Sequence, residues 1–115
     1  MQCALVVEPT NKSVMVGDNA WLNCSTDLTI PVIWCKWSAS GEKIVVYALD
    51  EIHQQFRSRF NVSPAREGRY DLLIRDTQLT DEGTYECQDN AGLGKSATTY
   101  LSVSGVGYQD TTGAL

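Results

Sequence analysis

Apolar and polar residues alternate along short runs of this chain, and turn-forming residues separate the runs. Alternation with a period of two is typical of a β-strand with one buried face, and no long stretch has the 3.6-residue period of a helix. Pro9 cannot donate to a ladder, so the first strand should break there and resume a few residues later. The sequence therefore predicts an all-β domain, with strands over residues 4–8, 13–16, 20–24, 32–37, 44–47, 59–62, 72–74, 85–88 and 99–103.

The run from Asp81 to Cys87, Asp-Glu-Gly-Thr-Tyr-Glu-Cys, combines features that suit a strand entering a core. Its aspartate can begin the turn, its glycine relaxes that turn, and the tyrosine hydroxyl can bond back to the corner that the strand leaves. Far upstream, Cys24 is followed by two tryptophans, Trp34 and Trp37. This framework resembles the immunoglobulin superfamily, in particular its variable-type (V-set) and intermediate-type domains.

The resemblance implies an immunoglobulin-like β-sandwich of two antiparallel sheets with Greek-key connections. Residues 1–104 would form a single V-like domain, and residues 105–115 a flexible linker or tail. A disulfide between Cys24 and Cys87 would join the two sheets across the core. We expect the mature chain to begin near Gln2, with any anchor or further domain outside this sequence. The expected core residues, at inward positions of their strands, are Leu22, Trp34, Leu72, Ile74 and Tyr85.

An arginine and an aspartate are expected to join two loops at one end of the sandwich. Ser58-Arg59-Phe60 resembles a family motif whose arginine pairs with an aspartate, which we assign to Asp81. A guanidinium can hold such a carboxylate through two parallel hydrogen bonds. The alternative is an exposed ion pair, which would contribute less than about 1 kcal/mol.

The two tryptophans lie three positions apart, so they point to opposite faces of one strand, and the sequence leaves open which one is the core residue. We favour Trp34, which is followed by Lys36 as in the family's Trp-x-Arg/Lys pattern. Cys35 and Trp37 then face outward, and Cys35 is a free or intermolecular thiol. With Trp37 inside, Cys35 would turn inward and could form a second bridge with Cys3. Four cysteines allow three pairings, so the sequence alone does not decide.

The composition of the chain indicates which kind of partner it binds and in which compartment it folds. The chain has 115 residues, enough for one domain, and 9 Lys+Arg against 14 Asp+Glu, which argues against a nucleic-acid partner. Four cysteines in so small a domain indicate an oxidising compartment. No signal peptide is recognisable, and no apolar run is long enough to insert into a membrane. Candidate N-glycosylation triplets begin at Asn11, Asn23 and Asn61, the last weakened by Pro64.

Catalysis and metal binding find little support in the residues. The single histidine, His53, lies on an irregular segment and is expected to be a surface residue. The cysteines lack the Cys-x-x-Cys spacing of a zinc site. We therefore expect neither an enzyme nor a bound cofactor or metal.

The expected function is protein recognition by an extracellular domain of a secreted or membrane-anchored receptor or adhesion molecule, whose partner is a protein ligand or a second copy. One alternative is a structural module of an intracellular filament protein. Another is an antigen-receptor-like V domain, because Gly92 to Gly94 and Leu101 to Val103 faintly resemble a joining segment. Binding should use the outer face of the sheet that carries Cys87, since aromatic anchors in polar surroundings are typical of interface centres. Counted by alternation, that face carries Cys35, Trp37, Ile44, Tyr47, Glu86, Gln88 and Tyr100.

Overall fold

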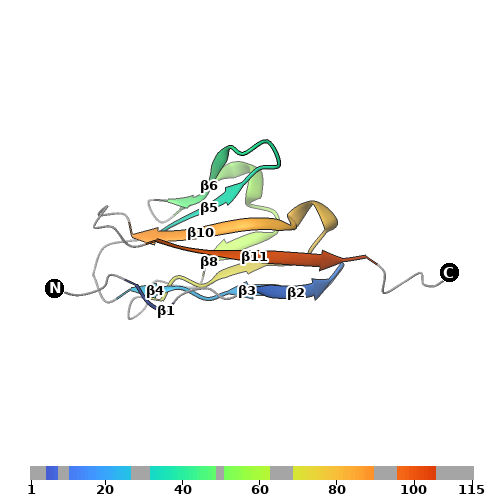
Figure 1. Ribbon diagram of the computed structural model, residues 1–115, viewed down its shortest axis with the longest axis horizontal. Coiled ribbons are helices and arrows are strands. Elements are labelled where there is room, and N and C mark those ends of the chain that lie inside the picture. Colours follow the sequence, from blue (N-terminus) through green and yellow to red (C-terminus); the bar gives the residue numbers. More distant parts are fainter. Residues whose placement is uncertain are drawn as a thin grey trace.

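The computed structural model describes residues 5–7, 11–26, 32–48, 51–62, 69–89 and 96–105, and all structural statements below concern these residues. Short strands dominate, and no α-helix occurs within these ranges (Figure 1). The strands are β1 (Leu5–Val7), β2 (Lys12–Met15), β3 (Ala20–Leu22), β4 (Ser25–Thr26), β5 (Val32–Trp37), β6 (Lys43–Ala48), β7 (Glu51–Ile52), β8 (Phe60–Val62), β9 (Leu72–Ile74), β10 (Gly83–Asp89) and β11 (Ser96–Ser104). Two single-turn 3-10 helices are η1 (Gln54–Phe56) and η2 (Leu79–Asp81).

The strands form a sandwich of two main layers, as the resemblance implied (Figure 1). One layer is a six-stranded sheet in the order β2-β11-β10-β5-β6-β7, and the other is a three-stranded sheet in the order β3-β9-β8. Among the described strands, β11 and β2 pair in parallel and the other neighbours pair antiparallel. β1 pairs with β4, so β1 and β2 belong to different sheets. This change of sheet agrees with the break predicted at Pro9, which itself lies outside the described residues.

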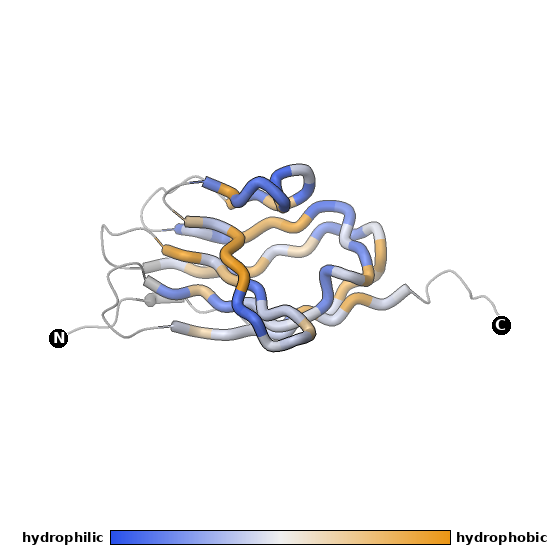
Figure 2. The backbone as a smooth tube through the Cα atoms, turned by 90° about the horizontal axis from the view of Figure 1, so that it is seen from above, coloured by the Kyte–Doolittle hydropathy of each residue, from blue (hydrophilic) through white to orange (hydrophobic). Residues whose placement is uncertain are grey.

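Burial alternates along the strands with the period of two that the sequence predicted. In β3, Ala20 and Leu22 are buried and Trp21 between them is exposed. Along β11, Thr99 and Leu101 are buried, whereas Tyr100 between them is exposed. Figure 2 shows hydrophobic and hydrophilic stretches following one another along the chain, as expected where each sheet has one buried face.

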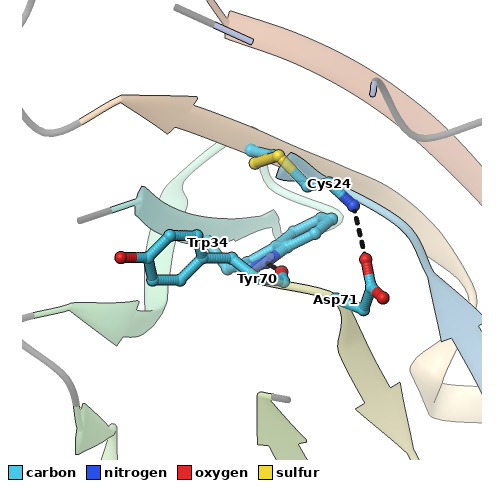
Figure 3. The surroundings of a disulfide bond; sticks show 5 residues. Cys24, Trp34, Tyr70 and Asp71 are labelled. Atoms are coloured by element: carbon cyan, nitrogen blue, oxygen red, sulfur yellow. Dashed lines mark hydrogen bonds between the residues drawn. A yellow bond between two sulfur atoms is a disulfide. The ribbon is translucent and has the colours of Figure 1, made fainter. Parts of the chain in front are cut away.

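A disulfide joins the two layers at the centre of the core. It links Cys24 to Cys87, which are 63 residues apart in the sequence, and both are fully buried. Trp34 lies beside the bridge and is also fully buried, so it is the core tryptophan (Figure 3). Its indole N–H donates to the carbonyl of Tyr70 at 2.7 Å, which satisfies the one polar atom of a large apolar side chain. The remaining predicted core residues are fully buried as well: Leu22, Leu72, Ile74 and Tyr85.

A network of hydrogen bonds closes one end of the sandwich around Asp81. The Arg59 guanidinium holds the Asp81 carboxylate through two bonds of 2.7 and 2.9 Å, the bidentate geometry expected from the sequence. The Tyr85 hydroxyl donates to the Asp81 carbonyl at 2.6 Å and completes the tyrosine corner. Burial raises the pKa of Tyr85, so its hydroxyl stays protonated and remains a donor. Because the Asp81 side chain is buried, this is not an exposed surface pair.

The ladder between β5 and β6 contains a bulge that controls which side chains face outward. Trp34 is paired with Tyr47, but the next residue, Cys35, is paired with Val45, so β6 carries one extra residue at this point. Val46 and Tyr47 are therefore both buried although they are consecutive. Beyond β6, β7 adds one short edge strand of the kind that variable-type domains carry.

Candidate protein-binding face

The side of the six-stranded sheet that points away from the three-stranded sheet is called the outer face below. Its members follow from the cross-strand register, because residues paired across a ladder share a face. Cys35 is paired with Glu86 and Val45, and Trp37 is paired with Lys43. On this side the described residues include Cys35, Trp37, Lys43, Val45, Thr84, Glu86, Gln88, Thr98 and Tyr100.

Lys43 organises the centre of the outer face. Its ammonium lies 2.9 Å from a carboxylate oxygen of Glu86 and 5.5 Å from the centroid of the Trp37 ring. The contact with Glu86 raises the pKa of Lys43, so the side chain is fully charged at neutral pH. A charged ammonium over an indole ring is attracted by the negative face of the ring. Lys43 therefore connects β6 to β10 and fixes the position of Trp37, which remains 36% exposed.

Cys35 faces outward, but it is not the accessible thiol that the sequence suggested. It is only 3% exposed, because Val45 and Glu86 flank it on the neighbouring strands and the Lys43–Glu86 pair spans β5. Burial raises the pKa of the thiol, which keeps it protonated and unreactive. The side chain points outward as expected and Cys35 is a free cysteine, but its burial leaves little thiol surface for the intermolecular bond that was the alternative.

The second bridge considered from the sequence, Cys3–Cys35, depended on an inward Trp37. Trp34 is inside instead, so Cys35 turns away from the core and is a free cysteine. Cys3 lies outside the described residues.

Two residues assigned to the outer face from the sequence lie on the inner side. Tyr47 is 6% exposed, is paired with Trp34, and its ring lies 6.4 Å from that of Tyr70. Ile44 is paired with Lys36, whose ammonium lies over the ring of the core residue Tyr85. The bulge in β6 places both residues inward.

Val45, rather than Ile44 or Tyr47, points to the outer face, and it is 40% exposed. Sequence reasoning missed it. The signal available was that positions 44 and 47, three apart, cannot share the outer face of a regular strand.

Tyr100 adds a second aromatic side chain at the β11 side of the outer face. It is 42% exposed, and its hydroxyl donates to one carboxylate oxygen of Glu82 at 3.2 Å. The other oxygen of Glu82 accepts the backbone N–H of Val103 at 2.8 Å. Partial desolvation and the Glu82 carboxylate both raise the pKa of Tyr100. Glu82 thus holds Tyr100 in place, much as Lys43 holds Trp37.

The two remaining predicted contact residues lie between these anchors. Glu86 is buried and contacts Lys43, and Gln88 is half-buried. Their outward direction agrees with the sequence, but Glu86 offers little free surface. A cleft of about 690 Å³ opens beside the face at the end of the sandwich, lined in part by Lys36, Trp37, Ile44, Phe56, Phe60, Leu79 and Tyr100.

The described residues contain no group of three His, Cys, Asp or Glu side chains placed to hold a metal ion. His53 is exposed and its ring lies 6.4 Å from that of Phe56, at the edge of the domain. No helix within the described ranges is long and apolar enough to cross a membrane. The glycosylation candidates Asn11, Asn23 and Asn61 are all exposed.

Comparison with known proteins places this fold in a family. The sequence model of the immunoglobulin V-set domain matches residues 7–104, and the chain belongs to that family. Domains of this family are recognition modules rather than enzymes. Such domains of receptors and adhesion proteins are typically extracellular, and the Cys24–Cys87 bridge agrees with that.

A curated relative is the V-set domain-containing T-cell activation inhibitor 1 of Rattus norvegicus, which is 30% identical over 91 residues. The match covers 70% of this chain but only 32% of the relative, so the chain spans about a third of that protein.

Solved structures share the fold over most of the chain. The RIG-5 IG1 homodimer is 18% identical with a TM-score of 0.74, over 84% of this chain and 92% of that one. Dpr1 IG1, solved bound to DIP-eta IG1, is 21% identical with a TM-score of 0.70, over 86% and 92%. The first immunoglobulin domain of mouse SynCAM 2 is 23% identical with a TM-score of 0.65, over 85% and 94%.

Proposed function

We propose that this domain recognises a protein partner outside the cell through the outer face of its six-stranded sheet. The observation that carries the proposal is a group of three exposed apolar side chains on that face, Trp37, Val45 and Tyr100. Exposed apolar groups surrounded by polar residues mark contact sites, and tryptophan and tyrosine dominate the binding energy of many interfaces.

The anchors are held in place before any partner arrives. Lys43 contacts both Trp37 and Glu86, and Glu82 accepts the hydroxyl of Tyr100. A side chain that is already fixed loses less conformational entropy on binding. This preorganisation supports a role in recognition rather than a surface that is merely covered by its own side chains.

The solved relatives support a second immunoglobulin domain as the partner. The RIG-5 IG1 structure is a homodimer, and the Dpr1 IG1 structure is a complex with DIP-eta IG1. We therefore propose that the partner is another domain of this fold, and that a second copy of this chain is one such partner.

The two alternative functions receive less support. The Cys24–Cys87 disulfide favours an oxidising compartment over the cytoplasm, which argues against a filament module. For an antigen-receptor-like domain, the Gly92 to Gly94 part of the joining-like segment lies outside the described residues. No observation on the described residues favours that alternative.

The test compares two tryptophans on opposite faces. Trp37→Ala should weaken self-association about 30-fold, as loss of a buried aromatic anchor typically does. Trp21→Ala, on the outer side of the three-stranded sheet, should leave it unchanged. Sedimentation velocity over a range of concentrations measures both. A wild-type chain that stays monomeric at every concentration contradicts self-association, and equal effects of the two substitutions contradict the choice of face.

A further inference from the structure

The outer side of the three-stranded sheet carries an exposed tryptophan and two exposed asparagines. Trp21 on β3 is 46% exposed and is paired with Leu73 on β9, which in turn is paired with Asn61 on β8. Asn23 follows Trp21 by two residues and is exposed on the same side, because Leu22 and Cys24 alternate with them toward the core. Side chains two residues apart on a strand are about 7 Å apart. Asn23 is therefore the near neighbour of the Trp21 ring along the strand, whereas Asn61 lies two strands away, beyond Leu73.

Each of these two asparagines begins an Asn-x-Ser triplet whose middle residue is not proline. They differ from the third, Asn11, whose side-chain oxygen accepts the backbone N–H of Tyr100 at 2.9 Å and is thereby committed to β11. The Asn61 oxygen accepts the N–H of Val62, and Pro64 follows its triplet. Asn23 combines an intact triplet, exposure and an adjacent aromatic ring.

We propose that Asn23 carries an N-linked glycan whose first N-acetylglucosamine lies against the ring of Trp21. The glycan then covers the apolar side chains of Trp21 and Leu73, which are paired on the outer side of the three-stranded sheet. The proposal rests on the extracellular location in the proposed function, because the modification takes place in the secretory pathway. It also explains how an exposed tryptophan opposite the binding face stays out of unwanted protein contacts.

The modification itself is a substitution at the anomeric carbon of a lipid-linked oligosaccharide diphosphate. The side-chain nitrogen of Asn23 forms a bond to that carbon and loses one proton. The bond between the carbon and the diphosphate oxygen breaks, and the lipid diphosphate leaves with the electron pair. Apolar C–H groups on one side of the sugar can then pack on the indole face, which removes apolar surface of both from water.

The experiment uses the chain secreted from mammalian cells, with glycopeptide mass spectrometry for occupancy and thermal unfolding for stability. Wild type should carry a glycan at Asn23. Asn23→Gln should lower the melting temperature of the secreted chain by about 4 °C, the size expected from losing one aromatic stacking contact in a domain this small. In a Trp21→Ala background the same substitution should lower it by less than about 1 °C. In a Trp37→Ala background the full shift should remain.

Two controls separate the glycan from the substitution and from the binding face. The chain refolded from bacteria has no glycan, so Asn23→Gln should not change its melting temperature. A secreted wild-type chain that is unmodified at Asn23 overturns the proposal, and so does an equal shift with and without Trp21. Self-association of the same secreted samples is measured separately. If Trp37→Ala does not weaken self-association, the proposed function is contradicted and the glycan proposal still stands. If Asn23 carries no glycan, the glycan proposal is contradicted and the proposed function still stands.

Discussion

Trp34 and Trp37 belong to the same strand, β5, but they lie on opposite sides of the sheet and their surroundings differ. Trp34 is fully buried beside the Cys24–Cys87 disulfide, and its indole N–H is bonded to the carbonyl of Tyr70. Trp37 is partly exposed, and the ammonium of Lys43 lies over its ring. The inner tryptophan fills the space beside the disulfide (Figure 3). The outer one leaves part of its surface available to another molecule.

The same contrast separates the two ion pairs that accompany these sides. Arg59 and Asp81 form a bidentate pair with a buried carboxylate, and that carboxylate also accepts the N–H of Gln78 at 2.8 Å. Lys43 and Glu86 form a pair in which the lysine side chain is more than a third exposed. The first pair holds the fold together, whereas the second positions a contact residue. Substitutions in Trp34 and in the Arg59–Asp81 pair should therefore lower the free energy of unfolding more than substitutions in Trp37 and in the Lys43–Glu86 pair.

The largest difference is expected between the two tryptophans. Trp34→Ala should cost about 3–5 kcal/mol of unfolding free energy, because it removes a buried aromatic side chain and leaves a cavity. Trp37→Ala should lower the free energy of unfolding by less than about 1 kcal/mol, because the Trp37 side chain is partly exposed and lies outside the core. Urea denaturation of the chain refolded from bacteria, which carries no glycan, measures both, with Trp21→Ala as an exposed control on the other sheet. If Trp37→Ala proved as costly as Trp34→Ala, the two sides of β5 would not differ as described.

A smaller difference is expected between the ion pairs, beginning with Arg59 and Asp81. A double-mutant cycle with Arg59→Met and Asp81→Asn should give a coupling energy of about 1–3 kcal/mol, because two charge-assisted hydrogen bonds are lost from a partly buried site. The measurement is the unfolding free energy of the four variants in urea. Additive losses would show that the pair contributes no more than an exposed one.

The smallest effect is expected for Lys43 and Glu86, whose coupling should be about 0.2–1 kcal/mol and should decrease with added salt. Its pH dependence has a definite sign. Because the pKa of Lys43 is raised in the folded state, the contribution is fully present below the unfolded-state pKa of about 10.4 and is lost as the pH rises through the folded-state value. Unfolding of wild type and Glu86→Gln between pH 8 and about 11 should converge at the upper end. A constant difference across this range would contradict the pair.

Residues whose environment depends on short-range pattern were predictable from the sequence. Cys24, Cys87 and the Asp-x-Gly-x-Tyr-x-Cys run specify the framework, and the corner bond from Tyr85 needs only the four residues back to Asp81. The inward positions of Leu72 and Ile74 follow from alternation alone. This part of the core was therefore predictable from the sequence.

The outer face was less accessible, because it depends on how separate strands align. One extra residue in β6 turned Ile44 and Tyr47 inward and Val45 outward, and no short-range signal gives the position of a bulge with certainty. Cys35 is buried because the long side chain of Lys43, on one neighbouring strand, reaches across it to Glu86 on the other. Such coverage arises only after the sheet has formed.

The parallel pairing of β2 with β11 has a mechanical consequence. Lys12 at the start of β2 is paired with Leu101, and Met15 at its end with Ser104, so the two strands run side by side in one direction. Tension applied to the chain before Lys12 and after Ser104 would pull these strands past each other along their length (Figure 1). All the hydrogen bonds between them would then share the load and break together rather than one at a time. We therefore expect the domain to resist stretching along the direction of these two strands.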